Sequence, residues 1–271
     1  MTDEVGNPIR EPLQLVIDGP PPPYTKDCSR WLSSDSPGRA SAAFSSSPYL
    51  NGYRGETPSG MSYYDLGAAR DEKRFRVCAR CIPAKRTEAL HIHNGLDSED
   101  DILATITRSV KETSYNGEGQ DTFNFTLHAI EGFGNVGEQV KMYRLCDSKW
   151  GHRNTLELVV DTGGRSERFQ WRPSKGKEVR GLAGYSSGWK LVRMTSREAG
   201  VGGRRMSREE GFTSDGREVV AVIAHTLSLR KDFVFAVLGS GRSGALGSAW
   251  ETAALLSGIW IWWNSVNGSM D

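Results

Sequence analysis

Ser248-Ala-Trp-Glu-Thr-Ala-Ala-Leu-Leu-Ser-Gly-Ile-Trp-Ile-Trp-Trp-Asn264 is the stretch of sequence that decides the fold of this protein. It contains no proline and follows a glycine-rich segment, and Ser248 with Glu251 three residues later has the pattern of a capping box. At about 100° per residue, the apolar side chains cover most of the helix circumference and leave no polar stripe for water. We therefore predict one helix, buried on all sides, over residues 248–264.

Two surroundings suit a helix that is apolar all round: a lipid bilayer or the interior of a protein. At ~1.5 Å per residue the segment is roughly 25 Å long, whereas a bilayer span needs about 20 apolar residues and ~30 Å. We predict that the helix lies inside a protein core, where each tryptophan would bury about 150–250 Å². A tail-anchored membrane protein is the alternative.

The sequence before this helix, from Arg74 onward, has the pattern of many short strands. Runs rich in β-branched and aromatic residues are separated by turn residues about every ten positions. Strict alternation in Phe123-Asn-Phe-Thr-Leu127 indicates a half-buried strand, and Asp161-Thr-Gly-Gly164 and Asp215-Gly216 are typical of tight hairpins. The predicted strands are 75–82, 89–93, 102–109, 122–130, 139–146, 155–161, 167–172, 189–194, 218–225 and 232–238.

Consecutive strands joined by short turns favour antiparallel pairing, and so many strands must close or stack to hide their edges. The predicted fold class is therefore mainly β: a closed antiparallel β-barrel over residues 72–271 that encloses the C-terminal helix. Residues 1–71 are rich in Ser, Pro and Gly, and we predict that they are mostly disordered, above all from Asp18 to Asp71. Leu13 to Ile17 is a candidate first strand within this region.

Charge and composition limit the classes of function. The 271 residues include 34 Lys and Arg and 33 Asp and Glu, which leaves a net charge of +1 and no whole-chain field to recruit nucleic acid. The acidic, polar start does not look like a secretory signal, so we expect a cytoplasmic protein, with a peripheral membrane or nuclear location as alternatives. In that setting the four cysteines should be reduced.

From Phe169 onward, four segments of the chain carry a resemblance to known proteins: Phe169-Gln-Trp-Arg172, Ser187-Gly-Trp-Lys-Leu-Val-Arg193, Thr213-Ser-Asp-Gly-Arg-Glu-Val-Val-Ala-Val222, and Leu238-Gly-Ser-Gly-Arg-Ser-Gly-Ala-Leu-Gly247 leading to Trp250. This stretch resembles a set of uncharacterised fungal tubby-like proteins. A many-stranded antiparallel barrel around a hydrophobic C-terminal helix also resembles the tubby C-terminal-like fold, which tubby proteins, LURP-one-related proteins and phospholipid scramblases share. The resemblance implies a non-enzymatic domain, and in tubby proteins the barrel binds phosphoinositide lipids.

Two glycine motifs have the residue spacing of enzyme sites but lack the strands and helices that such sites require around them. Gly239-x-Gly241-x-x-Gly244 matches the dinucleotide fingerprint, which works only inside a βαβ unit, so we predict no cofactor and a sharp turn into the barrel mouth instead. Gly184-Tyr-Ser186-Ser-Gly188 matches the nucleophile elbow, which needs a strand before the serine and a helix after it. Neither is predicted here, and a hydrolase using Ser186 is kept as an alternative.

A possible metal site and two basic clusters complete the candidates for chemistry. Cys78, Cys81, His91 and His93 have side chains that bind zinc, but residues three apart in a strand face opposite sides. We predict no metal ion, and keep a metal-dependent enzyme as the alternative. The clusters 172–177 and 204–205 are interpreted as exposed loop charges that could touch phosphates.

The sharpest motif for a partner lies near the N-terminus. Pro21-Pro22-Pro23-Tyr24 fits the Pro-Pro-x-Tyr ligand of WW domains, in which a preformed polyproline II helix loses little entropy on docking. Pro21, Pro22 and Tyr24 are the predicted contact residues. We thus predict a non-enzymatic barrel that binds a protein partner, such as a WW-domain protein, or a membrane phospholipid such as a phosphoinositide.

Overall fold

The computed structural model describes residues 49–58, 62–82, 87–108, 112–113, 119–120, 122–128, 139–145, 155–184, 187–195, 211–228 and 230–267. Each of the ten strands predicted from the sequence is present, with ends that differ by a few residues. The elements are β1 (Tyr49–Glu56), β2 (Ser62–Gly67), β3 (Lys73–Ile82), β4 (Thr87–His93), β5 (Ile102–Arg108), β6 (Glu112–Thr113), β7 (Gly119–Gln120), β8 (Thr122–Leu127), β9 (Gln139–Leu145), β10 (Thr155–Asp161), β11 (Ser166–Ser174), α1 (Lys177–Ala183), β12 (Gly188–Arg193), β13 (Val219–His225), β14 (Phe233–Val237), α2 (Gly239–Arg242) and α3 (Gly247–Val266).

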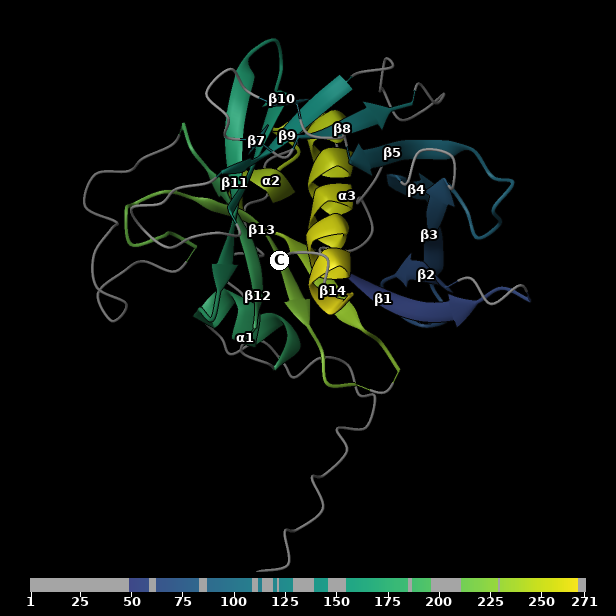
Figure 1. The fold of residues 1–271 in the computed structure, drawn as a ribbon. Coiled ribbons are helices and arrows are strands. Elements are labelled where there is room, and N and C mark those ends of the chain that lie inside the picture. Colours follow the sequence, from purple (N-terminus) through teal and green to yellow (C-terminus); the bar gives the residue numbers. More distant parts are fainter. Residues whose placement is uncertain are drawn as a thin grey trace, which may run out of the picture.

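Twelve of the described strands close into one antiparallel barrel, which confirms the predicted fold class. Around the barrel the strand order is β1-β14-β13-β12-β11-β10-β9-β8-β5-β4-β3-β2 (Figure 1). Sequence neighbours pair with one another except where β5 meets β8 and where β14 pairs with β1. That last pairing joins the two ends of the described sheet and leaves no barrel edge unpaired.

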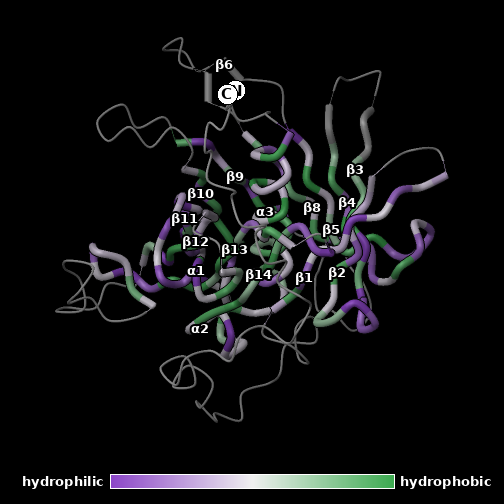
Figure 2. The backbone as a smooth tube through the Cα atoms, turned by 90° about the horizontal axis from the view of Figure 1, so that it is seen from below, coloured by the Kyte–Doolittle hydropathy of each residue, from purple (hydrophilic) through white to green (hydrophobic). Residues whose placement is uncertain are grey.

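The helix α3 fills the interior of the barrel. Figure 2 looks along it and shows the strands surrounding it on all sides. Its side chains are buried around the whole circumference; Trp250, Leu256 and Ile259, for example, are 0% exposed. The all-round apolar pattern of this segment is therefore explained by burial within the sheet that encloses it.

The helix is longer than predicted, and it begins differently. It has 20 residues, or about 30 Å, so length alone does not separate a core helix from a bilayer span. Across the described helices, none combines the length and apolarity needed to cross a membrane. The predicted capping box is wrong: the N-cap is Leu246, with no side-chain hydrogen bond, and the backbone turns through Gly247 at φ +82°. Ser248 and Glu251 consequently lie inside the helix.

Two strands lie within the range predicted to be disordered. β1 and β2 form a hairpin inside residues 1–71, so the predicted boundary at residue 72 is wrong. Leu50, Tyr64 and Leu66 turn their side chains into the core, because local alternation places an apolar residue inward at every second position. The high content of Ser, Pro and Gly over more than fifty residues concealed that alternation in the sequence. The candidate strand at Leu13–Ile17 lies outside the described residues.

The outer faces of β13 and β14 are also buried, beneath α1. Val179 and Leu182 of this short helix pack on outward-facing residues of the two strands. The residues beneath the helix are Val222, Ala224, Val234 and Ala236. A strand covered on both faces needs apolar residues at every position, which accounts for the continuous run Val219-Val-Ala-Val-Ile-Ala224.

Candidate functional site on the outer face of the barrel

All of the predicted partner and nucleophile residues lie outside the described part of the chain. This holds for Pro21, Pro22 and Tyr24, and for Ser186. The elements that flank the serine are described: α1 ends at Ala183 and β12 begins at Gly188. This is a helix followed by a strand, the reverse of the order that a nucleophile elbow requires.

The cysteine and histidine candidates lie on β3 and β4. Cys78 is directly opposite His91, and the rings of His91 and His93 are 6.5 Å apart between centroids. Each histidine uses Nδ1 locally: His91 with Thr105 Oγ1 at 3.0 Å, and the buried His93 with the carbonyl oxygen of Asp100 at 2.9 Å. In the part of the chain that is described, no group of three His, Cys, Asp or Glu side chains is placed to hold a metal ion.

The glycine string at the barrel mouth allows close packing. A Cβ on Gly241 would lie 2.5 Å from the ring of Trp250 and 2.7 Å from the carbonyl oxygen of Val220. Gly239 has φ +48°, and a Cβ there would meet the carboxylate of Glu218 at 2.4 Å. Glycine is thus required for α2 to fit between β13 and α3, a structural reason for the motif.

A compact ion-pair network, which we call the mouth cluster, anchors this turn. It consists of Glu167, Arg193, Glu218 and Ser240. Arg193 donates to both carboxylate oxygens of Glu167, at 2.6 and 2.7 Å. Glu218 accepts two bonds from Ser240 at the start of α2, from the backbone N–H at 2.6 Å and from the hydroxyl at 2.8 Å. The hydrogen bond from Arg193, reinforced by Thr162 and Thr195 and opposed by burial, lowers the pKa of Glu167 to about 2.

A second set of charges lies on the outside of the barrel, over β9 to β12. Lys141 and Arg168 are both paired in register with Val159, and Arg172 is paired with Lys190 on β12. We call five basic side chains the basic face: Lys141, Arg168, Arg172, Lys190 and, on the turn before β13, Arg217. Two acidic residues, Glu157 and Asp215, lie among these five basic ones.

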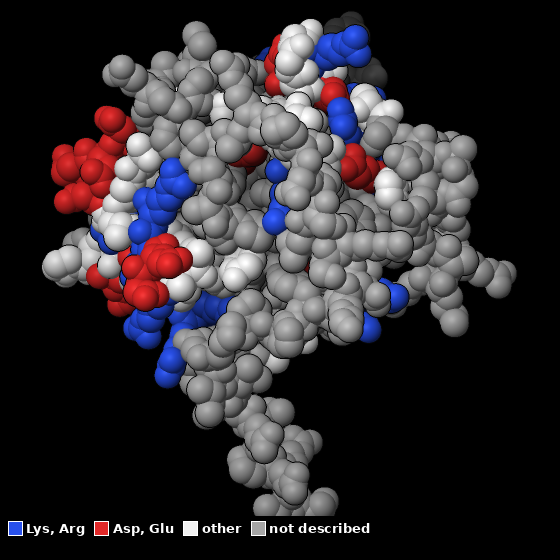
Figure 3. All heavy atoms as spheres, turned by 180° about the vertical axis from the view of Figure 1, so that it is seen from behind, with Lys and Arg blue, Asp and Glu red and all other residues white. Residues whose placement is uncertain are grey.

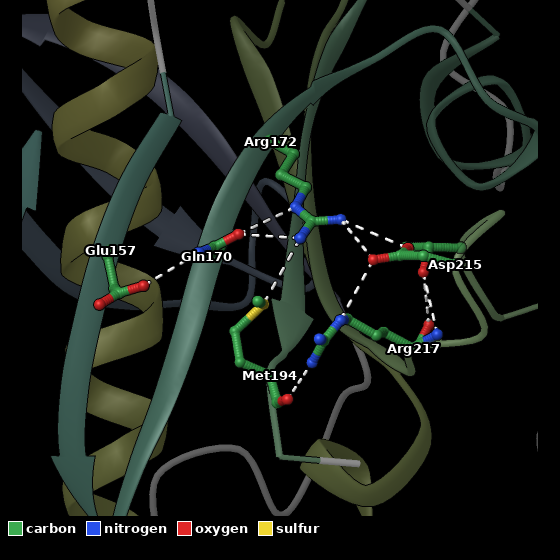
Figure 4. Close-up of polar contacts among 7 residues, drawn as sticks. Glu157, Gln170, Arg172, Met194, Asp215 and Arg217 are labelled. Atoms are coloured by element: carbon green, nitrogen blue, oxygen red, sulfur yellow. Dashed lines mark hydrogen bonds and ion pairs between the residues drawn. The ribbon is translucent and has the colours of Figure 1, made fainter. Parts of the chain in front are cut away.

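Arg172 is held from one side by a chain of hydrogen bonds (Figure 4). Its Nε and Nη2 atoms donate to the side-chain oxygen of Gln170, at 3.1 and 2.8 Å. The amide nitrogen of the buried Gln170 donates to Glu157 at 2.9 Å, and Arg168 donates to both oxygens of that carboxylate, at 2.9 and 2.8 Å. Because every link is a side-chain bond on neighbouring strands, the guanidinium plane of Arg172 is fixed by the sheet.

On its other side, Arg172 shares a carboxylate with Arg217. Its Nη1 atom lies 3.4 and 3.3 Å from the two oxygens of Asp215, and Nε of Arg217 lies 3.1 Å from one of them (Figure 4). Arg217 also donates to the backbone oxygen of Met194. Burial raises the pKa of Asp215, but the hydrogen bond from Thr213 and the charge of Arg172 outweigh it, so the pKa lies below its ordinary value. Two guanidinium groups thus converge on one carboxylate.

The basic clusters predicted from the sequence are only partly in loops. Arg172 lies in β11 and Lys177 begins α1, so the interpretation of 172–177 as one set of loop charges is wrong. Arg204 and Arg205 lie outside the described residues. Alternation in the sequence could have placed Arg172 on a strand. Arg168, Gln170 and Arg172 are each two residues apart and share the outer face, while Phe169 and Trp171 point inward.

Charges of both signs are interspersed on the surface. In Figure 3, which shows the molecule from behind, Lys and Arg side chains lie next to Asp and Glu side chains in several places. A mixed surface of this kind produces little long-range attraction, in line with the net charge of +1. Recognition of an anion would therefore depend on a few well-placed groups.

The fold and these contacts define a closed antiparallel β-barrel filled by its C-terminal helix, with an arginine pair on its outer face. No family model matches the chain, and neither a curated protein nor a solved structure matches it.

Proposed function

We propose that this chain is a non-enzymatic binding domain with a tubby-like barrel, and that it binds a membrane phospholipid, such as a phosphoinositide, through the basic face. The observation that carries the proposal is the pair of guanidinium groups of Arg172 and Arg217 on the outer face, with side chains 27% and 24% exposed. Arginine is well suited to phosphate because its planar fork donates two parallel hydrogen bonds to neighbouring oxygens. The protein would act as a cytoplasmic protein that reaches a membrane surface peripherally.

The filled interior favours an external site. Trp250, Trp260 and Trp262 of α3 are each at most 2% exposed, and they occupy the space in which a wider barrel would hold a small molecule. The ligand then has to meet outward-facing side chains. The resemblance of residues 169–247 to tubby-like proteins supports a lipid as the class of ligand.

A flotation assay with lipid vesicles tests this function. The full chain is mixed with phosphatidylcholine vesicles that contain or lack a phosphoinositide, and the protein that floats with the vesicles is measured. We expect recovery only with the phosphoinositide, and a loss of about tenfold in affinity for Arg172→Gln, because a charge-assisted hydrogen bond is removed.

The matched control removes the same charge from a different face. Arg54 lies on β1, and its side chain is 56% exposed in an ion pair with Glu56. If Arg54→Gln weakens recovery as much as Arg172→Gln, binding depends on overall charge alone. Equal recovery of the wild-type chain with and without phosphoinositide contradicts the proposed function.

A protein partner is a second proposal, and it depends on the N-terminal sequence. Pro21-Pro22-Pro23-Tyr24 fits a WW-domain ligand, with Tyr24 filling the pocket next to the proline groove. A peptide of this segment should bind a WW domain, and Tyr24→Ala should remove the binding. Unchanged affinity of the Tyr24→Ala peptide contradicts this proposal.

A further inference from the structure

The contact between Arg172 and Asp215 is long and exposed compared with the rest of its network. Its nitrogen–oxygen distances are 3.3 and 3.4 Å, whereas charge-assisted bonds between nitrogen and carboxylate are about 2.7–2.9 Å. The side chain of Asp215 is 44% exposed. In the mouth cluster the same pair of chemical groups, Arg193 and Glu167, lies at 2.6 Å with the carboxylate side chain only 13% exposed. With Nε of Arg217 at 3.1 Å and a hydrogen bond from Thr213 as further contacts, the carboxylate of Asp215 is held by longer contacts and is more exposed than that of Glu167.

The turn that carries Asp215 is held largely by bonds that do not involve its carboxylate. The N–H of Thr213 donates to the oxygen of Arg217 at 2.8 Å, and the N–H of Gly216 donates to the oxygen of Thr213 at 3.0 Å. The N–H of Arg217 donates to the Thr213 hydroxyl oxygen at 3.0 Å. Gly216, at φ +74°, supplies the left-handed residue that the turn requires. The carboxylate can thus turn to water while these backbone bonds of the turn remain.

The two arginines are both fixed by groups other than Asp215. Gln170 orients Arg172, and the backbone oxygen of Met194 accepts from Arg217. When Asp215 leaves, the guanidinium groups stay in place with hydrogen-bond donors and positive charge directed at the vacated position. A preorganised pair of donors of this kind binds an anion with little further loss of entropy.

We propose that Arg172 and Arg217 form a binding site for a phosphate monoester on a lipid headgroup, and that Asp215 occupies the position of this phosphate until the ligand displaces it. This inference rests on the proposed function and specifies its ligand. A phosphate monoester carries up to two negative charges and three acceptor oxygens, so it can pair with both guanidinium groups at once. A phosphodiester carries one charge and two free oxygens, and it is the weaker competitor for the carboxylate.

Asp215→Asn is the variant that tests the displacement. The asparagine has the same shape but no charge to compete with phosphate, so affinity for vesicles that contain a phosphatidylinositol phosphate should rise about tenfold. Asp161→Asn is the matched control, because Asp161 is an exposed aspartate of the β10–β11 hairpin with its own turn contact, to the N–H of Gly164. The control should change affinity by less than about twofold. Circular dichroism of each variant checks that the barrel is folded.

The vesicle composition tests the class of ligand. Phosphatidylserine is a phosphodiester lipid, and at equal surface charge it should recover much less protein than the phosphatidylinositol phosphate. A soluble inositol phosphate should compete with the vesicles but bind the protein more weakly than they do. Equal recovery with phosphatidylserine contradicts a phosphate monoester as the group that the protein recognises. Equal affinity for the soluble inositol phosphate contradicts a lipid as the source of that phosphate.

The results separate the inference from the function on which it rests. If the wild-type chain binds phosphoinositide vesicles but Asp215→Asn binds no more tightly than Asp161→Asn, Asp215 is not a displaceable occupant and only the inference fails. If neither the wild-type chain nor Asp215→Asn binds vesicles of any composition, the proposed function and the inference both fail. Binding by Asp215→Asn alone would mean that the ligand does not displace the wild-type carboxylate, and it would overturn both proposals.

Discussion

The mouth cluster and the basic face use the same residue types in opposite ways. In the mouth cluster, Arg193 and Glu167 meet at 2.6 Å in a mostly buried position and tie β11, β12 and α2 together. On the basic face, Arg172 meets Asp215 at 3.3 Å at the surface. An ion pair that is screened by water contributes little to folding, whereas breaking a buried pair leaves an unpaired charge. The difference indicates that the mouth-cluster pair stabilises the fold more than the surface pair, and under the proposed function the surface pair is the one that meets a ligand.

The largest effect should come from removing the cation of the mouth cluster. Arg193→Gln leaves the carboxylates of Glu167 and Glu218 without their main positive partner in a position of low exposure. We expect the free energy of unfolding to fall by about 2–4 kcal/mol, as measured by urea denaturation. A loss below about 0.5 kcal/mol would place this pair in the same class as surface pairs.

A methyl group at the barrel mouth should have the next largest effect. In Gly241→Ala, the added Cβ would lie 2.5 Å from Trp250 and 2.7 Å from a backbone oxygen that cannot easily move. We expect a loss of about 1–3 kcal/mol in the free energy of unfolding, from overpacking. Gly181→Ala in α1 is the control, since a Cβ there meets nothing within 4 Å. Equal stability of the two variants would show that α2 can shift.

Acid should weaken the mouth cluster through Glu167. The pKa of this carboxyl is about 2 in the folded protein and 4.5 ordinarily, so its contribution to stability is complete above pH 4.5 and is lost as the pH falls toward 2. Urea denaturation at several pH values between these limits measures the slope. Glu167→Gln should flatten it, and an unchanged slope would assign the acid sensitivity to other carboxyl groups.

The smallest effect on stability should come from the basic face. Asp215→Asn removes a carboxylate that is 44% exposed and held by long contacts, so the free energy of unfolding should change by less than about 0.5 kcal/mol. Thermal unfolding in dilute buffer measures it. A loss as large as that of Arg193→Gln would make the basic face a structural network and remove the contrast between the two regions.

Much of the fold could be predicted from local patterns. The strands alternate clearly, as in Phe123-Asn-Phe-Thr-Leu127, whose apolar side chains are all buried. The turn glycines at 163, 164 and 216 have positive φ angles, as the hairpin motifs predicted. Residues 49–67 were missed because two tyrosine-rich strands were averaged with a long stretch rich in Ser, Pro and Gly. The outward arginines of β11 were missed because a strand pattern identifies the buried face but does not say which exposed side chains meet.

The sequence by itself determined that many strands enclose one apolar helix, because side-chain periodicity and the absence of a polar stripe are local properties of the chain. Only the tertiary structure decided where the charged groups meet. Arg172 and Asp215 are 43 residues apart, and Arg193 and Ser240 are 47 apart. Such pairs form because the barrel brings distant strands and turns side by side, whereas alternation along one strand identifies its buried face and does not say which outward side chains become neighbours.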